Sequence, residues 1–170
     1  PSTRFNVVAM FEFMKYLGFL RVGVLYGYRS INQVIKNMFL ELVRHDQDTG
    51  EHLWTILLTH QINNVADASD AVDVLKSRDS RINFIALYED LGSVLLCQAF
   101  RHNLLPPNFN WMVASGWWNS NYMMLNARTL ECPCSSHELY QVSYGLVAAD
   151  RGPMLSSQDR HSLSGRSLSD

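Results

Sequence analysis

Clusters of basic residues are missing from this sequence, and so are long hydrophobic runs. The 14 Lys and Arg residues are scattered among 16 Asp and Glu residues, for a net charge of −2, which argues against a nucleic-acid partner. No apolar run approaches the ~20 residues that cross a bilayer. Arg4, Glu12 and Lys15 interrupt the segment where a signal peptide would be apolar. What is left is the ordinary composition of a globular domain, with 47% hydrophobic residues.

The motifs of common enzyme and cofactor sites are missing as well. There is no GxGxxG or GxxxxGK[ST] loop for a nucleotide, and no GxSxG elbow for a nucleophile. The six histidines have no paired spacing, and three cysteines are too few for a four-thiolate zinc site. We therefore expect no enzyme activity, no cofactor and no metal. The cysteines leave either three free thiols or one disulfide with one thiol to spare, and an extracellular setting would favour the disulfide.

Helical and extended patterns alternate along the chain. Apolar residues at helical spacing predict helices over 7–17, 30–42, 68–75, 91–102 and 135–141. Short apolar runs predict strands over 21–26, 53–59, 82–88, 109–115 and 143–149. Gly18 is expected to end the first helix and Ser30 to cap the second. Strands separated by single helices predict an α/β fold, an open parallel sheet with helices on both faces.

Aromatic and acidic residues follow two of the predicted strands. The third strand ends in Tyr88-Glu89-Asp90, and the fourth ends in Gly116-Trp117-Trp118. Ligands of open parallel sheets bind outside the carboxyl ends of the strands, so this pattern favours a binding site. Packing is the alternative, because an aromatic residue can cap the core and carboxylates suit the first turn of the next helix. Two adjacent carboxylates do not by themselves define an acid/base pair.

The composition divides the chain into two segments. Residues 1–150 have the patterns of one domain, whereas residues 151–170 are rich in Ser, Arg, Asp and Gly and predict a polar loop or a disordered tail. The chain begins on Pro1, not on Met. We therefore expect it to be a piece of a longer protein.

A resemblance to a known family is carried by the stretches GFLRVGVLYG, SRDSRINFIALYEDLGSVLLCQAFRHNLLPPNFNWMVASGWWNSNY and CSSHELYQVSYGLVAAD. They resemble the extracellular ligand-binding module of metabotropic GABA type B receptors, which are class C G-protein-coupled receptors. The order of Tyr88-Glu89 at a strand end, Cys97 in the next helix, and then Trp111 and Gly116-Trp117 is specific, and the correspondence covers almost the whole chain. The resemblance implies a two-lobed clamshell of the type I periplasmic-binding-protein fold, with residues 1–150 as its second, membrane-proximal lobe.

The resemblance also implies a site and a mechanism. The ligand contacts of this lobe map onto Tyr88 and Trp117, whose aromatic faces suit a small amino-acid-like ligand, GABA or a related molecule. Trp118 is expected to be a packing residue, and short insertions around Pro106 and before Gly116 depart from the family pattern. Closure of the lobes on the ligand would act through a receptor dimer partner and an absent membrane domain on a G protein. The location implied is the extracellular side of the plasma membrane.

A disulfide is the last feature that the resemblance implies. The family joins a Cys of the helix after the Tyr strand to a Cys ahead of the next helix. Cys97 fits the first position, and Cys134 is favoured over Cys132, the alternative, for the second. An N-x-S/T sequon is absent, which is unusual for an extracellular lobe. Two other readings remain open, namely a soluble amino-acid-binding protein of the same fold and a receptor subunit that binds no ligand.

Overall fold

The computed structural model describes residues 3–114 and 134–148. The helices are α1 (Thr3–Tyr16), α2 (Ser30–Asp48), α3 (Val65–Ser77), α4 (Glu89–Arg101) and α6 (Ser136–Ser143). The strands are β1 (Arg21–Gly27), β2 (Thr55–Ile62), β3 (Ile82–Ala86), β4 (Asn110–Val113) and β5 (Leu146–Ala148). Every strand pair is parallel, in the order β2-β1-β3-β4-β5. The predicted α/β fold with an open parallel sheet is confirmed.

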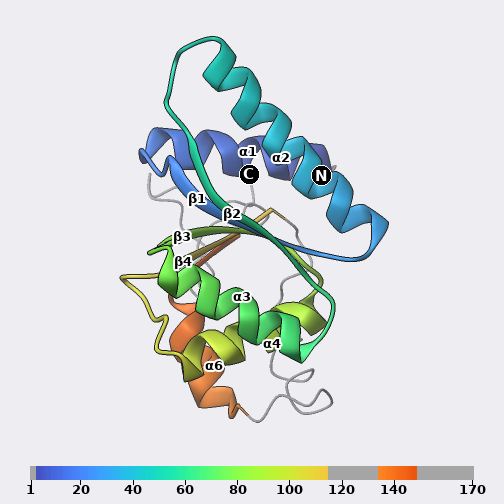
Figure 1. Cartoon of the computed structure of the whole chain (residues 1–170), viewed down its shortest axis with the longest axis vertical. Coiled ribbons are helices and arrows are strands. Elements are labelled where there is room, and N and C mark those ends of the chain that lie inside the picture. The colour runs from blue at the N-terminus through green and yellow to red at the C-terminus, as the bar shows by residue number, and fades with distance from the viewer. Residues whose placement is uncertain (1–2, 115–133, 149–170) are drawn as a thin grey trace, which may run out of the picture.

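Helices cover both faces of the sheet (Figure 1). Helices α1 and α2 lie on one face, and α3, α4 and α6 lie on the other. Strand β3 contributes to both layers, because Phe84 and Ala86 belong to the core under α1 and α2, whereas Ile85 belongs to the core under α3 and α4. Successive strand side chains point to opposite faces. A nearly continuous apolar run is therefore what a strand covered on both faces requires.

One helix end agrees with its prediction and another does not. Gly18, at φ +71°, ends α1 in a Schellman motif, in which its N–H and that of Phe19 bond back to carbonyls of the last turn at 3.0 and 2.8 Å. The predicted cap at Ser30 is wrong. Ser30 is the first residue of α2, and Arg29 holds the N-cap position without a side-chain hydrogen bond to the helix.

Strand boundaries differ from the predictions in several places; β5, for example, begins at Leu146, and Ser143 belongs to α6. Strand β3 ends at Ala86, and Tyr88 is instead the N-cap of α4, with φ −75° and ψ 163°. Strand β2 reaches Ile62 because its backbone stays paired with β1 up to the contact of Gly27 with Ile62. Pairing with a neighbour, and not the polarity of the side chains, decides where these strands end.

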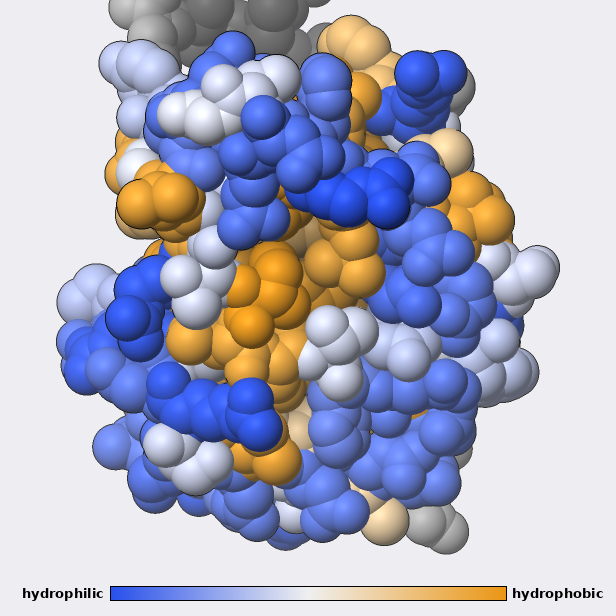
Figure 2. All heavy atoms as spheres, turned by 45° about the horizontal axis from the view of Figure 1, so that its top comes forward, coloured by the Kyte–Doolittle hydropathy of each residue, from blue (hydrophilic) through white to orange (hydrophobic). Residues whose placement is uncertain are grey.

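Hydrophobic side chains also reach the surface. On the face shown in Figure 2, hydrophilic residues surround a central strip of hydrophobic ones. Over the described residues, the most exposed large hydrophobic side chains are Phe5, Tyr16, Leu53 and Tyr144. The apolar residues of this chain are therefore not confined to its two cores.

The order of the strands reverses between β1 and β3. From β1 the chain crosses through α2 to β2 on one side, whereas β3, β4 and β5 follow on the other side. The loops after β1 and β3 therefore leave the sheet toward opposite faces. In open α/β sheets the crevice between such loops is where ligands bind, so this edge of the sheet is the place to look for a site.

Candidate functional site

Aromatic and charged side chains meet where β1 and β3 end. The register pairs Tyr26 with Ala86, so the loops that follow, with Tyr28-Arg29 after β1 and Tyr88 after β3, start side by side. The Arg29 guanidinium carbon lies 4.4 Å from the Tyr88 ring centroid and 5.9 Å from that of Tyr28. Arg29 Nη2 also donates to Asp90 Oδ2 at 3.1 Å. A cation thus lies between an aromatic ring and a carboxylate at this edge.

The charge of Arg29 is permanent. The Tyr28 side chain and, after it, the charge of Asp90 raise the pKa of Arg29 above its ordinary value, against the opposing effect of burial. Sequence reasoning missed Arg29, although a signal was available. Tyr28 and Arg29 come directly after one strand, and Tyr88 comes two residues after the end of another. The carboxyl ends of parallel strands lie at the same edge of a sheet, so these residues are expected to be neighbours.

Glu89 and Asp90 form the first turn of α4. Asp90 Oδ1 accepts a hydrogen bond from the Leu91 N–H at 2.8 Å, and the Glu89 carbonyl accepts one from Ser93 Oγ at 2.7 Å. Carboxylates at this position complement the positive end of the helix dipole. Their position is therefore the one expected of carboxylates that begin a helix.

Asn32, in the first turn of α2, is buried next to Gly27 at the end of β1. This side chain is 1% exposed, and neither its Oδ1 nor its Nδ2 has a hydrogen-bond partner in the structure. A Cβ atom on Gly27 would lie 2.3 Å from Asn32 Nδ2 and 3.3 Å from Leu87 Cδ2. Gln33 Nε2 donates to the Gly27 carbonyl at 3.2 Å. The absence of a side chain on Gly27 is what lets the first turn of α2 approach the strand.

Gly27→Ala tests this close packing. The added methyl group clashes with the buried amide of Asn32, and we expect the free energy of unfolding to fall by about 1–3 kcal/mol. Gly27→Ala combined with Asn32→Ala makes room for the methyl group, so the pair should destabilise less than the two single changes sum to. Urea unfolding of the four proteins measures this, and simple additivity would contradict the contact.

The predicted ligand residues are placed only in part. Tyr88 is half-buried at the site described above. Trp117 and Trp118 lie outside the described residues, so a shared site of Tyr88 and Trp117 stays a prediction.

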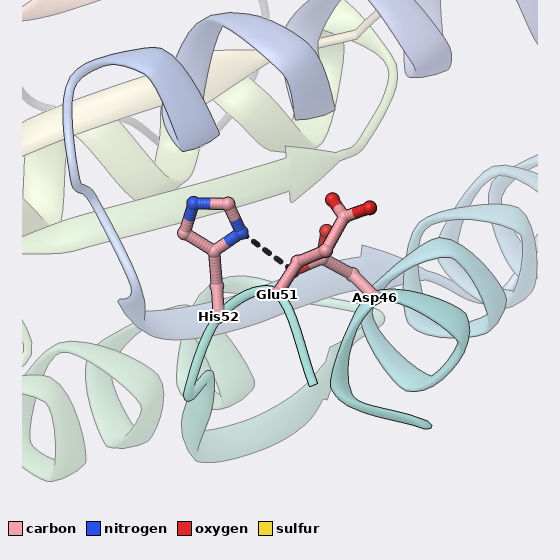
Figure 3. A group of neighbouring side chains, drawn as sticks. All are labelled: Asp46, Glu51 and His52. Atoms are coloured by element: carbon pink, nitrogen blue, oxygen red, sulfur yellow. Dashed lines mark hydrogen bonds and ion pairs between the residues drawn. The ribbon is translucent and has the colours of Figure 1, made fainter. Parts of the chain in front are cut away.

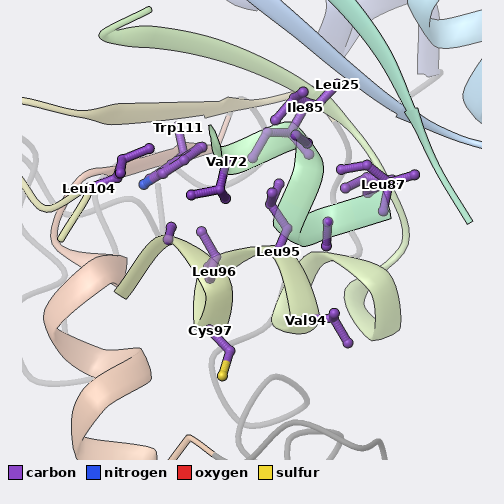
Figure 4. Packing of buried hydrophobic residues seen from close by; sticks show 14 of the residues in the cluster. Leu25, Val72, Ile85, Leu87, Val94, Leu95, Leu96, Cys97, Leu104 and Trp111 are labelled. Atoms are coloured by element: carbon purple, nitrogen blue, oxygen red, sulfur yellow. The ribbon is translucent and has the colours of Figure 1, made fainter. Parts of the chain in front are cut away.

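Cys97 and Cys134 form a disulfide in the structure, with Cα atoms 5.7 Å apart. Cys97 is fully buried on α4, and Cys134 is 8% exposed just ahead of α6. Figure 4 shows the Cys97 side chain leaving α4 away from the strand residues Leu25 and Ile85. Cys132, the alternative partner, lies outside the described residues. The bond connects α6 to α4, the helix that begins at the Tyr88 edge.

A second polar cluster lies at the opposite edge of the sheet. Asp46, on the last turn of α2, and Glu51 and His52, on the loop that follows, are the one group in residues 3–114 and 134–148 with donors near enough for a metal ion (Figure 3). Lys15 Nζ lies 3.1 Å from Asp46 Oδ1 and 3.2 Å from Glu51 Oε2. The ammonium group pairs with both carboxylates, so the cluster joins α1 to the end of α2 and to the loop that follows it.

Comparison with known proteins agrees with the fold. The family model described as receptor family ligand binding region matches residues 1–148. No curated protein matches the sequence. None of the helices in the described ranges has the length and apolar character needed to cross a bilayer. The family-model match and the open parallel sheet identify the chain as a member of the receptor ligand-binding region family. Its fold is that of one lobe of a periplasmic-binding-protein-like domain.

Proposed function

We propose that the chain is the second lobe of a GABA type B-like receptor domain, which holds a small amino-acid-like ligand between two lobes. One observation carries the proposal. Tyr88 lies at the carboxyl edge of the sheet, beside the reversal of strand order, in a chain that belongs to a receptor ligand-binding family. Ligands of open α/β sheets bind at this edge.

The chemistry of the edge suits a small zwitterion. The face of an aromatic ring covers methylene groups and attracts an ammonium group through its quadrupole. Asp90 adds a carboxylate to the same edge, one-third exposed at its side chain. Trp117, one strand further along, is proposed as the second aromatic contact. The ligand class that fits is an amino acid with an extended aliphatic part, such as γ-aminobutyric acid (GABA).

Signalling would follow from closure of the two lobes. A ligand held first by the other lobe gains the contacts with Tyr88 and Trp117 only in the closed form, and this difference in affinity shifts the equilibrium toward closure. We propose that closure acts through a dimer partner and a membrane domain on a G protein. The lobe would then lie on the extracellular side of the plasma membrane.

Tyr88→Ala in the full-length receptor tests the proposal. Loss of one aromatic contact made on closure is expected to cost about 1–3 kcal/mol, or about 5- to 150-fold in the EC50 for GABA. Tyr88→Phe keeps the ring and should retain most of the response. The measurement is a concentration–response curve for G-protein activation, with receptor number at the cell surface determined in parallel.

Tyr140→Ala is the matched control, because Tyr140 is a half-exposed tyrosine on α6. It should leave the EC50 unchanged. An unchanged EC50 in Tyr88→Ala at normal surface expression would rule out a ligand contact at Tyr88.

A further inference from the structure

The edge of the sheet at Tyr88 already holds a positively charged group, the guanidinium of Arg29. Arg29 lies over the Tyr88 ring, well inside the ~6 Å range of cation–π attraction, and is paired with Asp90. An aromatic face beside a carboxylate is the arrangement that recognises an ammonium or guanidinium group. We call Tyr88 and Asp90 the cation seat. In this structure of the lobe, the guanidinium of Arg29 fills it.

The position of Arg29 at the start of α2 does not explain why its guanidinium lies over the Tyr88 ring. Arg29 is the N-cap of α2, and the first turn of α2 contains no acidic residue. A positive charge is unfavourable at the positive end of a helix. The attraction that holds the guanidinium in place comes instead from the cation seat, which follows the neighbouring strand, and from the adjacent Tyr28.

The hold on Arg29 is weak enough to be exchanged. The side chains of Arg29 and Asp90 are 42% and 36% exposed, and ion pairs at such positions contribute little because water screens them. Asp90 also keeps its hydrogen bond from the Leu91 N–H when Arg29 leaves. Displacement of Arg29 therefore breaks no buried contact.

We propose that Arg29 is an internal competitor for the cation seat and sets the affinity and specificity of the site. The inference rests on the proposed function at Tyr88. Arg29 occupies the position over the Tyr88 ring beside Asp90 Oδ2, so a ligand ammonium group that binds at this position must displace it. A ligand without a cation leaves Arg29 in place and finds the seat occupied. The site therefore selects ligands with a positively charged group and lowers the affinity of all of them.

Arg29→Gln in the full-length receptor, with GABA as the probe, tests this inference. The substitution removes the competing charge and is expected to lower the EC50 by about 3- to 10-fold, the value of the exposed contacts that Arg29 makes. Arg29→Lys keeps a cation and should stay near the wild-type EC50. Surface expression is measured for each variant, and Arg29→Ala serves as the neutral variant if Arg29→Gln does not reach the surface.

A second background separates competition from a merely structural role. In Tyr88→Ala the seat is lost, so Arg29→Gln should no longer lower the EC50. A higher EC50 in Arg29→Gln would overturn the inference and assign Arg29 to an acidic group of the ligand, and an unchanged EC50 would also overturn it. A normal response in Tyr88→Ala alone would instead reject the proposed function, so the two failures are distinguishable.

Discussion

Replacing Cys97 and Cys134 together by alanine is expected to lower the free energy of unfolding by about 3–4 kcal/mol. The two residues are 37 positions apart, and a closed loop of that size restrains the unfolded chain by this amount in the loop-entropy model. Both side chains are buried, so the substitution also removes core contacts between α4 and the start of α6. Denaturant unfolding of the purified domain, with and without the substitutions, measures the difference.

Peptide mapping without reduction checks the pairing itself. The Cys97–Cys134 link should survive Cys132→Ala unchanged, because Cys132 is not its partner. A Cys97–Cys132 peptide in the wild-type protein would contradict the pairing in the structure. Three alkylatable thiols in the native protein would contradict a disulfide altogether.

Asp46→Ala is expected to have an effect of similar size, about 3 kcal/mol of unfolding free energy. Asp46 is 4% exposed, and its Oδ2 accepts a hydrogen bond from Trp54 Nε1 at 2.8 Å. Removing one partner of a buried pair leaves the other without its compensation. The expected loss of unfolding free energy lies at the low end of the range for breaking a buried pair, because Lys15 keeps its ion pair with Glu51. Glu51→Gln, an exposed partner of the same ammonium group, is the matched control and should cost well under 1 kcal/mol.

The Asp46 carboxylate makes the free energy of unfolding depend on pH. Burial alone raises the pKa of Asp46, but the hydrogen bond from Trp54 and the charge of Lys15 outweigh it, so the pKa lies below the ordinary value of 3.8. A lowered pKa contributes stability that is fully present above the unfolded value and is lost as the pH falls through the folded value. Wild type should therefore lose more stability below about pH 4 than Asp46→Asn does. Parallel unfolding curves from pH 5 to pH 2 would contradict this role.

Local patterns in the sequence are enough to predict the layers of this fold. The run from Phe84 to Leu87 is apolar on both faces, so it predicts a strand covered by helices on both sides. Gly18 follows the last apolar residue of the first helix, and only a residue that tolerates positive φ ends a helix in this way. Such features depend on neighbours in the chain, and a single sequence contains them.

Boundaries and caps were harder to predict because they depend on partners. Tyr88 continues an apolar run, yet β3 stops at Ala86 and Tyr88 adopts the extended backbone that precedes α4. Ser30 has the side chain of a good N-cap, but α2 starts one residue too early for it to serve as one. In both cases the neighbouring elements outweighed the local preference.

The sequence by itself determined the fold class and drew attention to Tyr88, because a strand end followed by an aromatic residue is a local pattern with a known place in an open sheet. Only the tertiary structure decided what Tyr88 touches. Arg29 and Asp90 are 61 residues apart in the chain, and they meet because β1 and β3 are neighbours on opposite sides of the reversal in strand order. Contacts between side chains depend on which strands pair and in which register, and this order is set by the packing of the whole sheet.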